Sequence, residues 1–122
     1  MLDYFFGLVA IDVSNKAQPE IVGGLHTAGE AFCLDVSDSR IFIGENMGGL
    51  TIMDNRVPEK ARIVGNFGIG GGWGVFARGD LAFCANLAGL MIVDSKDPKD
   101  PIELSYAGDI YNALAVKVVS EY

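Results

Sequence analysis

The sequence predicts an all-β protein built from about three copies of a four-stranded unit. Three observations support this prediction: an apolar motif that recurs at nearly constant spacing, short β-branched and aromatic runs between its copies, and 16 glycines and 4 prolines scattered among those runs. Glycine and proline in such positions are typical of tight turns between short strands. Half of the 122 residues are hydrophobic, so the chain has enough apolar material for a buried core.

The motif Gly-Leu-x-x-x-Asp opens three successive units. It reads GLVAID at 7–12, GLTIMD at 49–54 and GLMIVD at 89–94, so the repeats begin at Gly7, Gly49 and Gly89 and lie 42 and 40 residues apart. A second apolar motif follows each copy at a matching distance, at residues 19–23, 61–65 and, in a weaker form, 101–105. A fixed period of this length indicates a repeat architecture, so we expect residues 1–122 to form one repeat domain.

Two further apolar runs precede the second and third copies of the motif. They lie at 31–36 and 40–44, and again at 73–77 and 81–85, with turn-forming residues between the members of each pair. Each complete repeat thus supplies four short strands, and four-stranded meanders repeated at about 40 residues are typical of β-propeller blades. A β-solenoid is the alternative, although its coils usually repeat at shorter periods and need no hairpin turn between every pair of runs.

The two ends of the sequence resemble the two parts of one blade. Residues 2–6 precede the first motif where 44–48 precede the second, which places the start of the chain in a second strand. At the other end, residues 113–119 match the inner strand that opens at Ala31. Because an unpaired strand exposes backbone donors and acceptors, we expect another chain to close this edge.

Two copies related by a two-fold axis would close a six-bladed propeller in which each composite blade takes strands from both chains. Three copies with nine blades, and a longer parent chain, remain open as alternatives. The predicted interface residues are the aromatic group before the first motif and two valines of the last strand, since aromatic side chains are favoured interface anchors. These residues are Tyr4, Phe5, Phe6, Val116 and Val118.

Charge and composition argue against several classes of function. The net charge of −7 repels phosphate backbones and anionic lipid surfaces, so nucleic acid is not an expected partner. The sequence has no run of about 18 apolar residues and no signal-peptide pattern, so neither membrane insertion nor an export signal is predicted. Cys33 and Cys84 lie inside apolar runs, which predicts buried free thiols.

The motifs GLMIVD at 89–94 and PEIVG at 19–23 resemble those of the LVIVD-repeat family of β-propellers, and the resemblance covers essentially all 122 residues. It implies a propeller fold, usually in much longer chains that are often exported or displayed at bacterial and archaeal surfaces. The resemblance implies no catalytic residues, because the family generally has no assigned enzymatic role. Besides its shorter length, the sequence departs from the pattern at 55–58, where NRVP replaces Val-Ser-x-Pro, and at 102–104, where IEL replaces Ile-Val-Gly.

Asp12, Asp54 and Asp94 recur at one position of the repeat. Three carboxylates in a symmetric arrangement suggest a metal site, but each ends a strand just before a turn, where a carboxylate accepts local backbone N–H bonds. One aspartate per blade also leaves the three too far apart to share an ion. We therefore predict turn capping, with neither a metal nor another cofactor.

The connections from each outer strand to the next inner strand supply the candidate binding site, because propellers most often bind ligands near the axis that these connections cross. The ligand-binding candidates are His26, Glu30, Trp73, Asp109, Tyr111 and Asn112. His26 and Glu30 suggest an acid–base pair, but no nucleophile motif accompanies them, so no catalytic residue is predicted. A lone histidine beside a carboxylate is more often a hydrogen-bonded loop residue.

The glycine-rich run at 68–72 lacks the helix N-terminus and the Lys-Ser/Thr pair of a phosphate-binding loop. Its glycines would make room for Trp73, which we align with the small residues Ala31 and Ala113. Trp73 is then either a core residue or an aromatic wall for a ligand.

Because no complete catalytic set is present, the first functional hypothesis is a non-enzymatic interaction or scaffold module. Such a module would hold a protein, a peptide or a glycan at its axis or blade edges. The alternative is a small-ligand binder or a hydrolase-like enzyme whose site on the axis is formed by both subunits.

Overall fold

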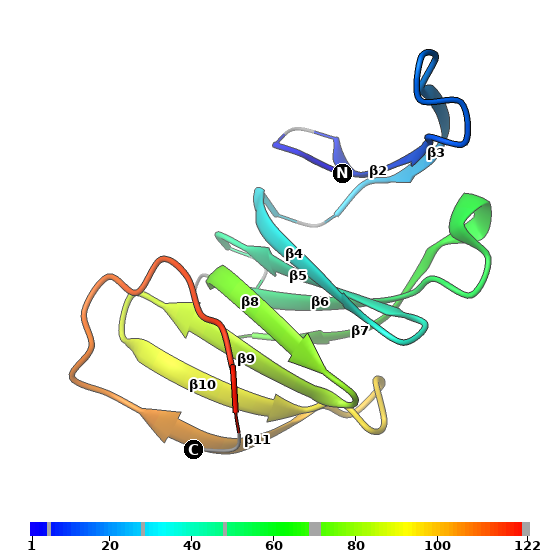
Figure 1. The fold of residues 1–122 in the computed structure, drawn as a ribbon. Helices are drawn as coiled ribbons and strands as arrows, with labels where there is room; N and C mark the ends of the chain where they lie inside the picture. Colours follow the sequence, from blue (N-terminus) through cyan, green and yellow to red (C-terminus); the bar gives the residue numbers. More distant parts are fainter. Residues whose placement is uncertain (5, 28, 48, 69–71, 121–122) are drawn as a thin grey trace.

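The computed structural model describes residues 1–4, 6–27, 29–47, 49–68 and 72–120, and it is an all-β structure of three antiparallel sheets packed face to face (Figure 1). The first blade contains β1 (Leu2–Asp3), β2 (Gly7–Asp12) and β3 (Glu20–Leu25). The middle blade contains β4 (Ala31–Ser37), β5 (Arg40–Glu45), β6 (Gly49–Asp54) and β7 (Arg62–Phe67). The last blade contains β8 (Gly72–Arg78), β9 (Leu81–Asn86), β10 (Gly89–Asp94) and β11 (Ile102–Ala107). A single 3-10 turn, η1 (Pro58–Lys60), lies between β6 and β7.

Strand register places the three blades in one repeat frame. Gly7, Gly49 and Gly89 open the equivalent strands β2, β6 and β10, and all three have the positive φ that glycine adopts without strain. Each of these glycines pairs with the last residue of the preceding strand, so β1 is equivalent to β5 and β9. Among the described residues, the first blade has no strand in the place of β4 and β8.

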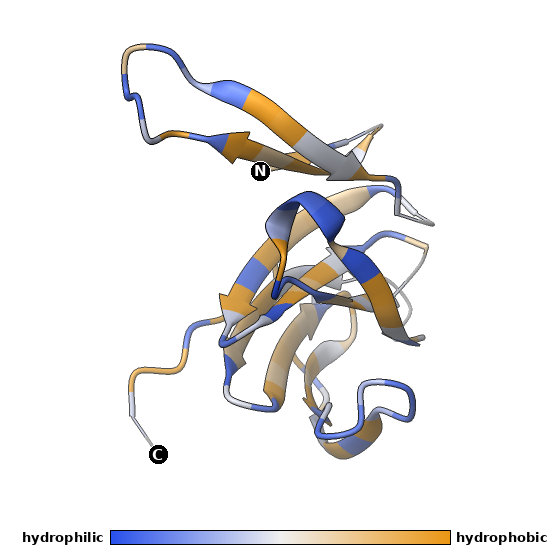
Figure 2. Cartoon of the chain, turned by 90° about the vertical axis from the view of Figure 1, so that its right-hand side faces the viewer, coloured by the Kyte–Doolittle hydropathy of each residue, from blue (hydrophilic) through white to orange (hydrophobic). Residues whose placement is uncertain are grey.

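The core lies in the two joints between blades, because the central strands of the middle blade, β5 and β6, are buried on both faces. Successive side chains of a strand point to opposite faces of the sheet. Phe42 accordingly packs with Leu50 and Ile52 against the last blade, whereas Ile41 and Ile43 pack against the first blade. Figure 2 shows the result: hydrophobic residues run along the strands and hydrophilic residues gather in the connecting turns.

Both inner strands carry a β-bulge at the same place, and this corrects the predicted alignment of Trp73. Ala31 pairs with Glu45 and Cys33 with Gly44, which leaves Phe32 as the extra residue. The register of β8 shifts in the same way across Trp73. Ala31 and Gly72 hold the same place in the two ladders, so Trp73 is equivalent to Phe32 rather than to Ala31, and the predicted alignment was one residue out of register.

Residues 113–119, which we predicted to form another inner strand, carry no strand within the described part of the chain. The segment nevertheless lies directly against β8, since a Cβ built on Gly74 would be 2.7 Å from Cα of Ala115. In Figure 1 it runs as an extended trace past the strands of the last blade. A strand requires a hydrogen-bonded neighbour, and the blade that would supply one is not formed by this chain. We call residues 113–119 the tail.

The two cysteines are free thiols, and they differ in burial. Cys84 is 1% exposed in the core between the middle and last blades, and burial raises its pKa to about 12. Cys33 is only partly buried, and burial also raises its pKa. The prediction of a buried thiol is thus confirmed fully for Cys84 and partly for Cys33.

Candidate functional site

A row of aromatic side chains runs from the turn after β1 to the inner strands β4 and β8. The rings of Phe32 and Trp73 are stacked, with centroids 4.7 Å apart and planes at 25°. Tyr4 of the first blade meets Phe32 edge-on at 5.8 Å. Both arrangements are favourable for aromatic pairs, so the row links β4 to β8 and the turn after β1 to β4. We call Tyr4, Phe32 and Trp73 the aromatic row.

Polar groups hold one end of the aromatic row in place. The hydroxyl of Tyr4 donates a hydrogen bond to Glu30, which lowers the pKa of the Glu30 carboxyl and raises that of Tyr4. The Asn46 side-chain amide also donates to Glu30, at 3.0 Å, and the Asn46 backbone N–H donates to the Glu30 carbonyl at 2.9 Å. Glu30 thus connects the turn after β5 to the start of the aromatic row.

Two buried polar atoms in this region have no hydrogen-bond partner within the described part of the chain. Glu45 is fully buried, and its Oε2 accepts from the Gly29 N–H at 2.8 Å while Oε1 is unpaired. The indole Nε1 of Trp73 is likewise buried and unpaired. Because an unsatisfied buried polar group costs free energy, a polar partner that reached either atom would be stabilised.

The predicted pair of His26 and Glu30 is not joined by a hydrogen bond among the described residues. Glu30 is hydrogen-bonded to Tyr4 and Asn46, as described above. His26 is exposed, and its ring lies 5.7 Å from that of Phe6. His26 lines a shallow apolar hollow of about 540 Å³ on the first blade, together with Met1 and Ile21.

The remaining predicted candidates lie in the connection after β11. Asp109, Tyr111 and Asn112 are all exposed, Tyr111 at 77%. Asp109 and Asn112 have positive φ, and the Asn112 N–H donates to the Leu87 carbonyl at 3.2 Å. Asparagine and aspartate tolerate this backbone conformation better than most residues, so the geometry is that of a tight connection. Residues 69–71 of the glycine-rich run at 68–72 lie outside the described residues.

The structure gives two of the predicted interface residues neighbours within their own chain. Tyr4 packs on Phe32, and Phe6 lies against His26 while remaining 62% exposed. Val116 and Val118 are partly buried within the tail. Phe5 lies outside the described residues. Sequence reasoning missed Phe32, because its role depends on the bulge that brings it into line with Trp73.

The recurrent aspartates cap turns, as predicted. Asp12 accepts from the Ser14 N–H at 2.8 Å, and the equivalent bonds of Asp54 and Asp94 measure 3.0 and 2.8 Å. The same local bond lowers the pKa of Asp12. Within the described part of the chain, no cluster of three or more histidine, cysteine, aspartate or glutamate side chains is arranged to hold a metal ion.

Three similar antiparallel blades with buried joints between them define a β-propeller-type module. The LVIVD repeat matches the chain at residues 5–27 and 69–107, which together make up half of it. The chain therefore belongs to the LVIVD-repeat family. No curated protein and no solved structure matched the chain. The described residues contain no helix that is long and apolar enough to cross a membrane.

Proposed function

We propose that the chain is a non-enzymatic interaction module that closes into a six-bladed propeller with a second copy of itself. The closed ring would present the aromatic row at its axis to a protein, peptide or glycan partner. The observation that carries the proposal is the complementarity of the two blade faces that lack a neighbour in the chain.

The last blade has one face without a neighbouring blade in the chain, which we call its free face. The equivalent face of the middle blade is buried against the last blade. Phe83, Leu90 and Ile92 point away from the middle blade, because their neighbours along β9 and β10 belong to the core of that joint. By register, these three side chains are the equivalents of Phe42, Leu50 and Ile52. Those equivalents are fully buried, whereas Phe83, Leu90 and Ile92 are only partly covered.

The first blade also has a free face. It is equivalent to the face that the last blade buries against the middle blade. Val9 and Ile11 alternate with the core residue Leu8, so they face away from the middle blade. Ile11 is the equivalent of the buried residues Met53 and Val93. Since the two free faces correspond to the two sides of each existing joint, the last blade of one copy would fit against the first blade of the other.

Backbone geometry supports the same pairing. The amino group of Met1 donates to the Val9 carbonyl at 2.8 Å, and the Met1 carbonyl accepts from the Val9 N–H of β2 at 2.7 Å. In an antiparallel ladder the next residue then points its N–H and C=O the other way, so those of Leu2 face the open edge of β1. The register of the two complete blades predicts that Leu2 pairs with Ala115, and Met1 with Val116, in the tail of the second copy.

The solution mass tests this proposal, measured by light scattering over a dilution series. We expect a two-chain mass that falls to one chain on dilution. Ile21→Asp should weaken the association strongly, because Ile21 is 75% exposed in the single chain and lies on the free face of the first blade. Val57→Asp is the matched control, since Val57 is also exposed, at 49%, but lies in the loop of the middle blade.

A folded single chain at every concentration would overturn the proposal, and so would equal weakening by both substitutions. A three-chain mass would replace the six-bladed ring with a nine-bladed one. Circular dichroism of each variant separates loss of association from loss of folding.

A small-ligand site at the axis is the second candidate function, favoured by the unpaired Glu45 Oε1 and Trp73 Nε1. A ligand could stack on the exposed ring of Phe32 and hydrogen-bond to one of these two atoms. Trp73 is the only tryptophan, so its fluorescence reports on the site directly. Titration with neutral monosaccharides and with a quaternary ammonium ion should change this signal, and Phe32→Leu should weaken the response; an unchanged signal with both probes would exclude these two ligand classes.

A further inference from the structure

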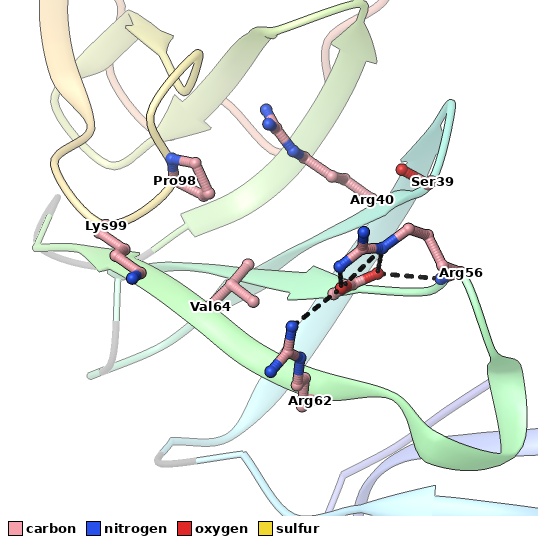
Figure 3. A pocket seen from close by; sticks show the side chains of 8 residues that line it. Ser39, Arg40, Arg56, Arg62, Val64, Pro98 and Lys99 are labelled. Atoms are coloured by element: carbon pink, nitrogen blue, oxygen red, sulfur yellow. Dashed lines mark hydrogen bonds and ion pairs between the residues drawn. The ribbon is translucent and has the colours of Figure 1, made fainter.

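A cationic hollow lies in the joint between the middle and last blades, apart from the aromatic row (Figure 3). It has a volume of about 320 Å³, and its lining includes Arg40, Arg56, Arg62 and Lys99, with Asp54 as the only carboxylate among its eight lining residues. Four cationic side chains and one carboxylate thus line the hollow of a chain whose net charge is −7, and one further carboxylate, Asp80, pairs with Arg40 outside the lining. A hollow of this size can hold a small ligand.

Two of the arginines are fixed by partners in the fold. Arg40 donates to Asp80 at 2.9 Å and to the Ser95 carbonyl at 2.6 Å, and its side chain is only 24% exposed. Arg56 donates from Nε to both carboxylate oxygens of Asp54 at 3.0 Å. Such charge-assisted bonds hold the guanidinium groups in place before any ligand arrives.

The other two cations, Arg62 and Lys99, make fewer contacts within the described part of the chain, so their N–H groups remain able to donate hydrogen bonds. Arg62 makes a single contact with Asp54, at 3.5 Å, and its side chain is 68% exposed. The ammonium of Lys99 has no hydrogen-bond or ion-pair partner among the described residues, and Figure 3 shows it across the hollow from Arg62. A guanidinium and an ammonium with free donors can together bind an oxyanion.

Comparison of the middle and last blades shows that the fold does not require positive charge at this position. A second hollow beside the first one adds Lys60 to Arg56 and Arg62. The equivalent hollow of the last blade is lined by Asp94, Lys96, Asp97, Asp100 and Ile102, and so has three carboxylates and one cation. The same backbone thus carries opposite charge in neighbouring repeats.

The joint between the first and middle blades gives the same contrast. Register and loop position place Glu20 where the middle blade has Arg62, and Glu59 where the last blade has Lys99. The β6–β7 loop occupies that joint, since a Cβ on Gly23 would be 3.6 Å from Cα of Glu59. Two acidic residues therefore stand where the cationic hollow has its two free cations.

We propose that the hollow between the middle and last blades binds a small oxyanion, a phosphate, sulfate or carboxylate group, through Arg62 and Lys99. Arg40 and Arg56 contribute positive potential and shape the walls. All of these residues come from one chain, so the site does not depend on ring closure or on the aromatic row.

Isothermal titration calorimetry with inorganic phosphate, sulfate and acetate at constant ionic strength tests the proposal and distinguishes the three oxyanions. The test variant is Arg62→Glu with Lys99→Glu, which installs the residues found in the neighbouring joint. We expect at least about a tenfold loss of affinity, because each contact to a charged group contributes more than a neutral hydrogen bond. The control is Arg78→Glu with Lys16→Glu, which makes the same charge change at two exposed positions that do not line the hollow.

Binding that the control retains and the test variant loses would support the site. Equal loss in both variants would show that net charge alone attracts the anion, and would overturn the proposal. No heat of binding with any of the three anions would also overturn it. Thermal unfolding of both variants without ligand establishes that each is folded.

Discussion

The two joints between blades share the same packing of equivalent strands, apart from the inner strand that the described part of the first blade lacks, but they differ in closeness and in charge. A Cβ on Gly65 in the second joint would overlap the carbonyl oxygen of Pro98. A Cβ on the equivalent Gly23 in the first joint would meet nothing closer than 3.6 Å. The second joint also carries Arg62 and Lys99 where the first has acidic residues.

Comparison of the two joints distinguishes the features that every repeat requires from the features that differ between repeats. Both joints keep apolar strand residues in contact, because burial of these side chains stabilises the packed blades. The loops at the ends of the strands lie partly in solvent, so their charges can change without disturbing the core. The middle repeat, which departs from the family motif at 55–58, supplies Arg56 from that stretch.

The largest expected effect is that of Phe42→Ala in the second joint. Phe42 is fully buried against the last blade, so its truncation should lower the free energy of unfolding by about 3–5 kcal/mol. Its equivalent on the free face, Phe83, is only partly buried and rests against Phe76, with centroids 6.3 Å apart. Phe83→Ala should therefore cost less in dilute solution. Urea unfolding measures both.

The same pair of variants sharpens the comparison at high protein concentration. If a second copy covers the free face, the cost of Phe83→Ala should rise toward that of Phe42→Ala as the concentration increases. A cost that does not change with concentration would argue against a third joint of the same kind.

The second prediction compares Gly65→Ala with Gly23→Ala. The added methyl at Gly65 must displace backbone of the β10–β11 loop, and we expect a loss of about 2–3 kcal/mol from this overpacking. Gly23→Ala should be close to neutral, because its methyl would make ordinary van der Waals contacts with Glu59. Thermal unfolding tests both variants. Similar losses would mean that the two joints are equally tight.

Much of the fold could be predicted from the sequence because the repeat marks the strands. The predicted bounds of 7–12, 49–54 and 89–94 are those of β2, β6 and β10. The tail did not form its predicted strand, since an apolar pattern gives a strand only where a ladder partner exists. Local sequence cannot supply that partner.

The candidate sites were harder to predict, because they depend on contacts between repeats. Trp73 was identified from its place beside the axis, but its stacking partner Phe32 was missed. The bulge that aligns the two residues leaves no sequence mark beyond the aromatic side chains themselves. The cationic hollow was missed for a similar reason: Arg40, Arg62 and Lys99 come from two blades and lie far apart in the sequence.

The third prediction concerns the two thiols. Cys84→Ser places a hydroxyl in the core of the second joint and should cost about 1–2 kcal/mol. Cys33→Ser should cost less, because Cys33 is partly exposed and the serine hydroxyl would keep some contact with water. Urea unfolding under reducing conditions compares the two variants. A larger loss of stability for Cys33→Ser than for Cys84→Ser would contradict the greater burial of Cys84.

The smallest expected effect is on the acid stability of the two turn-capping aspartates. The hydrogen bonds and charge of Arg56 hold the pKa of Asp54 far below its ordinary value, whereas Asp12 has only the local bonds from Ser14 to lower its own. A carboxyl whose pKa is lower in the folded state stabilises the protein above its unfolded pKa, near pH 4, and loses this contribution as the pH falls through the folded value.

Asp54→Asn should therefore reduce stability at pH 7 more than Asp12→Asn, and the difference between the two variants should shrink as the pH is lowered below about 4. Urea unfolding at pH 7 and at pH 3 measures this convergence. Because both carboxylates are near the surface, added salt should also reduce the difference at pH 7. A difference that persists unchanged in acid and in salt would mean that Asp54 acts through shape rather than charge, and that the charge contrast between the repeats has no energetic consequence at this turn.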